Sequence, residues 1–458
     1  NAKALRSGVS PTADLSASSL LLHSRCVVAM TWLIGETMSL LSDRTARLLD
    51  EPIALVPRLV VLLLCSGTLL SSAAWLPVAR SLPKVGFFTE FPILYTPTIT
   101  LLLLGLAVVG CLLLFSLPDS RLAPSLILFA LAFLLIEDAL RLQPWVWFAA
   151  VLLVVLPRRP RPRPFADASD KRANAHLLRI AAWPEDHDRS RLFGTLRIIL
   201  AGLYLWSGIW KLNPAFLTEV VPFFADAIEL RSVVDALPEI GLVIPVIEIA
   251  AGLALLIGWR LRSATLLLGL LHLAVIFALL LLDWNHVVIP WNFVLVALLF
   301  IVRERAATEV DLRADLTAAF RSVRGILAFL LAWGLPVIGL FGVAGEGVTW
   351  RLYSGLETEA VFVISPEDRD RFADINATHF FQREREGRDM LVLRSWSYDE
   401  TGLPLPSTQS YLEGLGRRLC ERTDRGEEGL RLSIRTPFMA EERSVAIGCD
   451  RPVSSLPL

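Results

Sequence analysis

Residues 263–282 read SATLLLGLLHLAVIFALLLL, twenty residues without a formal charge and with one histidine, His272, near the middle. An α-helix rises about 1.5 Å per residue, so this stretch is roughly 30 Å long, the thickness of the hydrocarbon core of a bilayer. It therefore predicts a transmembrane helix. Comparable apolar runs predict further spans at 55–78, 97–117, 122–140, 143–156, 195–212, 239–258, 286–302 and 325–344.

The composition of the whole chain agrees with this pattern. Hydrophobic residues make up 54% of the 458 positions and charged residues 19%, with a mean hydropathy of +0.56. A soluble protein of this size rarely reaches such values. No phosphate-binding loop, dinucleotide fingerprint, haem attachment site or helical zinc motif occurs. We therefore expect an all-α polytopic membrane protein of about nine transmembrane helices, with a small C-terminal α+β extracytoplasmic domain.

Changes in composition divide the chain into five segments. Residues 1–52 are predicted to be an N-terminal cytoplasmic or interfacial segment, in which 20–41 is apolar but carries charges, so that whether it crosses the membrane stays open. A first group of transmembrane helices follows at 53–156, and a basic, Pro/Arg-rich linker at 157–194. A transmembrane core is expected at 195–345, and the extracytoplasmic domain at 346–458.

The basic linker predicts the orientation. Its start, PRRPRPRP at 157–164, combines arginine with alternating proline, which favours a stiff, extended chain. Short basic loops lie on the cytoplasmic side of membranes, so we expect the linker and the N-terminus in the cytoplasm. Counting spans forward then places the C-terminal domain outside, in the periplasm if the protein sits in a bacterial inner membrane. The expected partner of the basic residues is the lipid bilayer; no nucleic acid is expected.

The C-terminal segment alternates short β-type runs with polar stretches. The runs predicted to form strands are 360–364, 390–393, 430–434 and 444–447, and a helix is predicted from Thr408 to about Arg422. Cys420 and Cys449 both fall in this segment. They could pair in an oxidising compartment and would stay reduced in a cytosol, and the sequence leaves both alternatives open.

Three ionisable residues interrupt neighbouring predicted spans: Lys211, Glu248 and His272. A charge at membrane depth costs a few kcal/mol unless it is paired or hydrated, so each is a candidate functional residue. Each also has a structural interpretation. Lys211 could extend to the headgroups, Glu248 could be a neutral hydrogen-bonded acid, and His272 could be a packed core residue.

Other polar groups are interpreted structurally. Glu137, Asp138 and Arg141 are expected at the charged end of one helix. The acidic run EDHD at 185–188 resembles a metal cluster but is interpreted as a solvated turn, and no metal site is predicted. Five aromatic and polar residues are expected to ring the outer mouth of the helices: Trp284, Asn285, His286, Trp291 and Asn292.

The stretch LYLWSGIWKLNPAF at 203–216 resembles the signature of the vitamin K-dependent γ-carboxylase (HTTM) superfamily, with DoxX-like membrane proteins as a more distant resemblance. An aromatic residue, a small residue, glycine and Lys-Leu close a membrane helix there, and the matching positions here are Tyr204, Ser207, Gly208, Lys211 and Leu212. An intramembrane acid, a glycine four residues later and a histidine 24 residues after the acid follow in both, here as Glu248, Gly252 and His272.

The resemblance implies quinol-linked chemistry of the lyase type, in which Lys211 is the base that deprotonates a reduced, vitamin K-like quinone. Glu248 and His272 would complete the catalytic set. The quinone would then lie against Tyr204, Trp206, Gly208, Trp210 and Gly252. The chain departs from the carboxylases at Trp210, where they carry a second lysine, and at Phe216, where they carry tryptophan.

Two functions are therefore expected from the sequence. The first is an HTTM-like membrane enzyme that uses a membrane-embedded lysine as its base. The alternative is a non-catalytic structural or scaffold subunit of a larger membrane protein complex, with other membrane subunits or a soluble outer-face protein as partners. In the alternative, the three ionisable groups only satisfy one another.

Overall fold

The computed structural model describes residues 55–156 (without 79, 87–95 and 119), 186–304, 314, 317, 320–341, 345–383, 388–423, 429–435 and 442–449. The predicted N-terminal segment 1–52 lies outside the described residues, and so does the basic linker up to residue 185. The chain divides into two compact units at Leu55 and Val56, and all the elements below belong to the second unit, Val56–Leu458.

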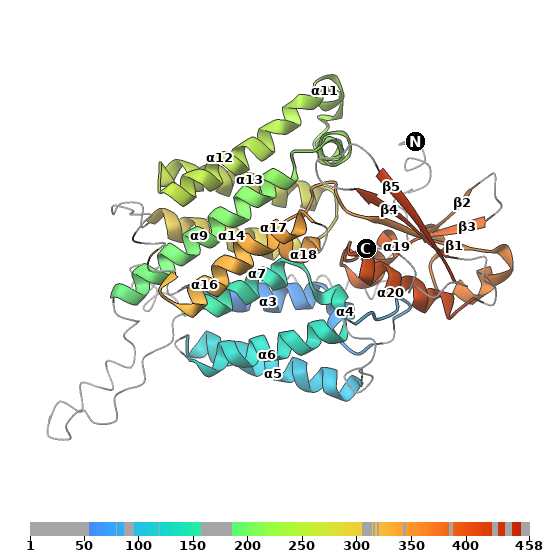
Figure 1. Ribbon diagram of the computed structural model, residues 1–458, viewed down its shortest axis with the longest axis horizontal. Coiled ribbons are helices and arrows are strands. Elements are labelled where there is room, and N and C mark those ends of the chain that lie inside the picture. The colour runs from blue at the N-terminus through green and yellow to red at the C-terminus, as the bar shows by residue number, and fades with distance from the viewer. Residues whose placement is uncertain are drawn as a thin grey trace. The chain divides into compact units, whose positions relative to one another are not determined.

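A helix forms in each of the nine segments predicted to span the membrane (Figure 1). In chain order these are α3 (Val56–Leu70) with α4 (Ser72–Trp75), α5 (Pro97–Ser116), α6 (Leu122–Glu137), α7 (Pro144–Val155), α9 (Asp186–Trp210), α12 (Val243–Ile257), α13 (Leu261–Leu281), α14 (Val288–Glu304), and α16 (Val323–Phe329), which continues through the π-turn η8 (Leu330–Gly334) into α17 (Leu335–Gly339).

Four of the described helices are long and apolar enough to cross a bilayer: Pro97–Ser116, Leu192–Trp210, Pro238–Ile257 and Leu261–Leu281. The 3-10 turn η6 (Pro238–Leu242) opens the third of these. Other apolar helices, such as α3, α6 and α7, are shorter. The protein is thus mainly helical and suited to a membrane.

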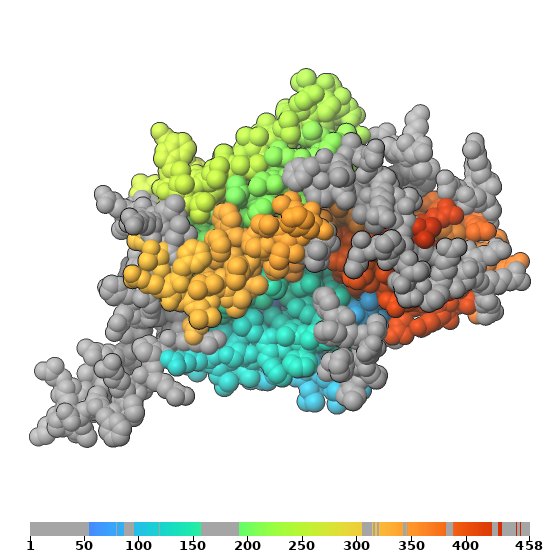
Figure 2. Space-filling model, viewed as in Figure 1, coloured from blue at the N-terminus to red at the C-terminus, as the bar shows by residue number. Residues whose placement is uncertain are grey.

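Burial distinguishes a central helix from peripheral ones. In the most apolar stretch of α9, 78% of the residues are buried within the protein, whereas in those of α5 and α13 only 22% and 28% are buried. Leucine, valine and phenylalanine side chains cover the exposed faces of the peripheral helices. An example is the face of α16 and α17, drawn in orange in Figure 2, where Val323 is 82% exposed. In a bilayer, such faces would contact lipid.

The start of α9 differs from the prediction. The helix begins at Asp186, inside the stretch interpreted as a solvated turn, and not near residue 195. Farther along α9, the buried Arg197 donates to the carbonyl oxygens of Leu255 and Leu256, at the end of α12.

Short helices that were not predicted connect α9 to α12. They are the π-turn η5 (Phe216–Val220), α10 (Val221–Ala227) and α11 (Arg231–Ala236). A small core of Phe216, Val221, Ala225 and Val234 holds them together.

The C-terminal part is the expected α+β structure. Its five-stranded antiparallel sheet has the order β2-β3-β1-β4-β5. The strands are β1 (Glu359–Ile364), β2 (Phe380–Arg383), β3 (Arg388–Val392), β4 (Gly429–Arg435) and β5 (Glu442–Gly448), and the helices are α18 (Glu346–Thr349), α19 (Leu393–Thr401) and α20 (Gln409–Cys420). Strand β2 and helix α19 were not predicted, and Leu393, predicted to end a strand, begins α19 instead.

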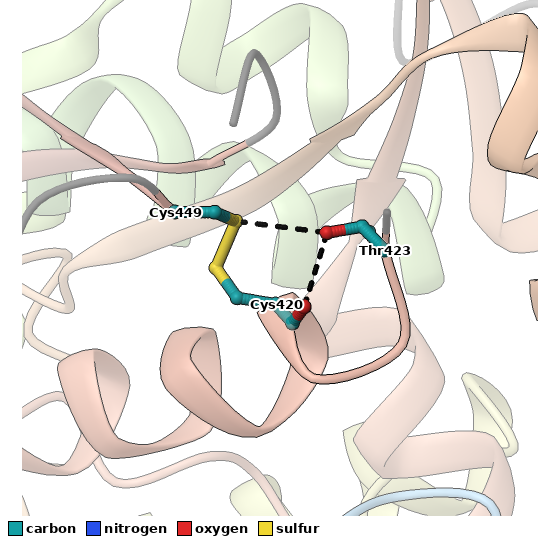
Figure 3. Close-up of a disulfide and its surroundings, with 3 residues drawn as sticks. All are labelled: Cys420, Thr423 and Cys449. Carbon is teal, nitrogen blue, oxygen red and sulfur yellow. Dashed lines mark hydrogen bonds between the residues drawn. A yellow bond between two sulfur atoms is a disulfide. The ribbon is translucent and has the colours of Figure 1, made fainter. Parts of the chain in front are cut away.

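A disulfide joins Cys420, at the end of α20, to Cys449, which follows β5 (Figure 3). The Thr423 hydroxyl donates to the Cys420 carbonyl oxygen beside it. The bond fastens the helix to an edge strand of the sheet. Among the described residues, Cys65 and Cys111 are free thiols.

Specific hydrogen bonds attach the α+β part to the helices. The Glu400 carboxylate accepts from the backbone N–H of Ser81, from the Ser81 hydroxyl and from the backbone N–H of Leu82. The Gln143 amide donates to the Pro404 carbonyl oxygen.

Candidate functional site: a buried polar cluster

Lys211 lies just beyond the last residue of α9, yet only 7% of its surface is exposed. Its Nζ lies 2.6 Å from the Ser207 hydroxyl oxygen and 2.7 Å from each carboxylate oxygen of Glu248. Side chains on a helix point back toward its N-terminus, which carries this ammonium group into the bundle. Lys211 therefore does not extend to the headgroups but forms a buried ion pair.

Two glycines allow the helices that carry this pair to approach. A Cβ added at Gly208 would lie 2.8 Å from the Pro245 carbonyl oxygen of α12, and one added at Gly252 would lie 2.9 Å from the Leu205 backbone nitrogen of α9. Both positions thus face backbone atoms, which cannot move aside as a flexible side chain could. The space beside both glycines is thus filled by the facing helix.

His272, in α13, lies between two hydrogen-bonding partners. Its Nε2 is 2.7 Å from the Tyr204 hydroxyl of α9, and its Nδ1 is 2.6 Å from Oδ1 of Asn292 in α14. Tyr204 is 1% exposed and Asn292 5% exposed. The imidazole therefore connects α9 to α14.

The ion pair and the histidine chain belong to one cluster. Tyr204, Ser207, Gly208 and Lys211 follow one another at the three- and four-residue spacing of a single helix face. On this face Ser207, which contacts Lys211, lies one turn after Tyr204, which contacts His272. We call Tyr204, Ser207, Lys211, Glu248, His272 and Asn292 the polar cluster. The three ionisable residues singled out from the sequence all belong to it.

Trp206 and Trp210 lie on a different face of α9. At 100° per residue they are far around the helix from Tyr204 and Lys211. The Trp210 indole N–H donates to the Thr349 carbonyl oxygen, and the Arg351 guanidinium lies 5.6 Å from the Trp210 ring. The ring centroid of Trp206 lies 6.4 Å from that of Trp210. The Trp206 indole N–H is buried and has no hydrogen-bond partner among the described residues. The structure thus separates these tryptophans from the lysine they were expected to accompany.

The residues expected together at the outer mouth lie in different places. Trp284 contacts the rings of Phe223, Tyr353 and Tyr398 at centroid distances of 5.0–5.6 Å. Asn285 donates to the Tyr353 hydroxyl. Asn292, in contrast, faces His272. Its place in the cluster could not be predicted, because it depends on how α13 and α14 rotate against each other.

Glu137, Asp138 and Arg141 lie at the end of α6 and just after it, as expected, and they form a second buried group. The Arg141 guanidinium pairs with Glu137 at 2.9 Å and also donates to the carbonyl oxygens of Ala74, Leu134 and Trp75. Lys84 pairs with Glu137 as well, at 3.1 Å. Since this guanidinium is saturated by backbone acceptors, we assign the group to the structure of the α4–α6 region.

The geometry of the polar cluster permits proton transfer. Nζ of Lys211 and the Glu248 oxygens are within direct hydrogen-bond reach, and so are the Tyr204 hydroxyl and Nε2 of His272. Both contacts lie among apolar helices, where water competes little for the proton. Ser207, quoted only as part of the resemblance, and Asn292, expected at the outer mouth, were not predicted as site residues, and both complete the hydrogen bonding. Ser207 alone had a signal there, because it precedes Lys211 by four residues.

Comparisons of this chain with protein-family models, with curated proteins and with solved structures find no match.

Proposed function

We propose that this chain is an integral membrane enzyme of the HTTM type, in which the polar cluster moves protons to and from a lipid-soluble quinol. The observation that carries the proposal is the contact of Lys211 with both oxygens of Glu248 inside the helical region. An ion pair at this depth is costly to desolvate, and replacing such a pair with apolar residues is often neutral or stabilising. Its presence is more easily understood if the two groups exchange a proton.

In this proposal the Lys211 ammonium passes its proton to the adjacent Glu248 carboxylate. The products, an amine and a carboxylic acid, are both uncharged, which apolar surroundings favour. The neutral amine is then a base that accepts a proton from a hydroxyl group within reach, while the Ser207 hydroxyl holds it in place.

A quinol suits the donor and acceptor groups of the cluster, because it brings ionisable hydroxyl groups on a ring soluble in lipid. When bound, it would supply the redox chemistry. The chain's own residues would orient its hydroxyl groups and accept their protons.

The same proposal includes the topology: nine spans, a cytoplasmic basic linker and a C-terminal α+β domain on the outer face, in the periplasm of a bacterial cell. The Cys420–Cys449 disulfide supports it, since disulfides persist in oxidising compartments and are rare in the cytosol.

The test is a direct search for the quinol and its turnover. The full chain, purified in detergent, is extracted with organic solvent, and the extract is analysed by mass spectrometry for quinones. Oxygen consumption is then followed after addition of a reduced short-chain naphthoquinone. We expect a co-purifying quinone and protein-dependent oxygen uptake that Lys211→Met lowers by about 10²-fold or more, the usual contribution of a positioned base. Lys84→Met is the matched control, since it removes a lysine from the distant ion pair with Glu137, and it should retain the rate.

The alternative, a scaffold subunit, is favoured by the completeness of the hydrogen bonding: Lys211, Glu248 and His272 all have partners within the cluster. A protein with no quinone, no oxygen uptake and stoichiometric co-purifying subunits would support the scaffold and reject the enzyme.

A further inference from the structure

The orientation of the Asn292 amide determines where the hydrogen atom of His272 lies. The amide nitrogen, Nδ2, donates to the Val288 carbonyl oxygen one turn earlier in α14, at 2.8 Å. The amide oxygen, Oδ1, is therefore the atom that faces Nδ1 of His272, at 2.6 Å. An amide oxygen can only accept a hydrogen bond, so Nδ1 must carry the hydrogen.

The state of the other ring nitrogen follows. A neutral imidazole carries one hydrogen, so Nε2 presents a lone pair when Nδ1 is protonated. A second hydrogen would place a net charge among the apolar side chains of α13. The Tyr204 hydroxyl, 2.7 Å from Nε2, is therefore the donor of that hydrogen bond, and its oxygen keeps its own lone pairs for another partner.

We propose that Asn292 is a positioning residue that locks His272 in the Nδ1–H tautomer, so that Tyr204 and His272 form a proton-accepting relay separate from the Lys211–Glu248 pair. In the relay, a hydroxyl group hydrogen-bonded to the Tyr204 oxygen gives up its proton to that oxygen while the phenolic proton moves to Nε2. One O–H bond breaks in the donor, one is re-formed on Tyr204, and an N–H bond forms on His272. The Asn292 oxygen then faces an imidazolium, which it stabilises by accepting from Nδ1–H.

The tautomer follows from the geometry alone, whereas the use of the relay on a bound hydroxyl compound rests on the proposed function. The experiment separates the two by reading the tautomer without any substrate. The full chain is labelled with ¹³C,¹⁵N-histidine, reconstituted in liposomes and studied by solid-state NMR. The chain has six histidines, and the His272 signals are identified by their loss in His272→Gln. Correlation of each ring nitrogen with its neighbouring carbons shows which one carries the hydrogen.

We expect the wild type to show Nδ1 protonated and Nε2 bare. Asn292→Leu, which removes the acceptor, should convert a large fraction of His272 to the Nε2–H tautomer. Tyr204→Phe should leave the tautomer unchanged, because Asn292 sets it. Asn285→Leu is the matched control, a buried asparagine of the α13–α14 connection whose amide donates to Tyr353, and it should not alter the His272 signals.

An Nε2–H or doubly protonated His272 in the wild type would overturn the proposal, and so would a tautomer indifferent to Asn292→Leu. If the tautomer responds as expected and the protein consumes no quinol, the role of Asn292 stands and the proposed function fails. If quinol turnover depends on Lys211 but the tautomer is wrong, the relay alone is rejected.

Discussion

At the scale of single residues, Lys211 stands at the end of a helix and is nevertheless buried. From its position, Lys211 could reach the headgroups, and many membrane lysines do. What decides against this is the direction of its side chain, which runs back toward Ser207 and meets Glu248. The pair then depends on both members, because either charge alone would be buried without compensation.

This dependence can be measured. Lys211→Met leaves the Glu248 carboxylate buried without its cation and should destabilise the protein by about 3–5 kcal/mol, as removal of one partner of a buried pair generally does. Lys211→Met/Glu248→Leu removes both charges and should recover most of that loss. Thermal unfolding in detergent, followed by size-exclusion chromatography, provides the readout. A double variant no more stable than the single one would show that the pair is not coupled.

At the scale of elements, helix packing explains how the cluster is assembled. Helices α9 and α12 lie close enough for Lys211 and Glu248 to meet because Gly208 and Gly252 present no side chain between them. Such small residues are common where membrane helices cross closely.

We therefore expect Gly252→Ala to separate α9 from α12, since its Cβ would lie 2.9 Å from one backbone atom of α9 and 3.2 Å from another. The cost should be about 1–3 kcal/mol, as for other overpacking substitutions. Gly269→Ala in α13 is the control, because nothing lies within 4 Å of its added Cβ, and it should be neutral or slightly stabilising. Unfolding temperatures in detergent compare the two; equal effects would contradict the packing argument.

A second element-scale prediction concerns His379, which precedes β2 and contacts α19. Its Nδ1 lies 3.0 Å from the Ser395 hydroxyl and its Nε2 3.1 Å from the Asp399 carboxylate. Burial lowers the pKa of His379 below its usual value, although Asp399 and Glu400 act in the opposite direction. The unfolded chain consequently binds a proton more readily than the folded one, and stability rises with pH in this window.

The contribution of His379 should be complete above its ordinary pKa of about 6.5 and be lost as the pH falls toward its lowered folded value. Unfolding temperatures of the full chain between pH 5 and pH 8 test this against His379→Gln, which does not titrate. The wild type should lose more stability on acidification than the variant. An equal pH dependence in the variant would show that His379 contributes nothing, and a steeper one would reverse the sign of its contribution.

How much of these elements could be predicted depends on what determines each of them. Apolar runs favour helices directly, so each predicted span contains a helix, and four of the described helices are long and apolar enough to cross a bilayer. The strand runs at 360–364 and 430–434 fall within β1 and β4. The short elements α10, α11, β2 and α19 depend on tertiary contacts more than on periodicity. The trio Lys211, Glu248 and His272 stood out because charge is rare at membrane depth. Of their partners, Ser207 has a signal in its four-residue spacing from Lys211, whereas Asn292 is identifiable only once the helix rotations are known.

At the scale of the whole molecule, the disulfide and the basic linker both bear on which side of the membrane the C-terminal α+β part faces. The bond between Cys420 and Cys449 joins residues 29 positions apart in the sequence. By lowering the conformational entropy of the unfolded chain, a loop of this length stabilises the folded state by about 3–4 kcal/mol. It would persist only where thiols are not kept reduced.

We expect both cysteines to be oxidised in cells and to face outward. In a variant whose other cysteines, Cys26, Cys65 and Cys111, are replaced with serine, a membrane-impermeant maleimide polymer added to intact spheroplasts should not label the protein. After an impermeant reductant is added, it should label two sites, seen as a mass shift on a gel. Labelling of intact spheroplasts without reduction would show free thiols on the outer face and contradict the disulfide, whereas labelling only after lysis would place the domain in the cytoplasm.

A single asparagine connects the end of α9 to the segment that precedes β1. Asn213, two residues after Lys211, donates through its amide to the carbonyl oxygens of Trp210 and Ser354, while its side-chain oxygen accepts from the Phe216 N–H. Ser354 follows Tyr353, which is held in the left-handed backbone region at φ 57° and so has little freedom to adjust. A displacement of the segment around Ser354 would therefore be transmitted through the Asn213 amide to the backbone next to Lys211.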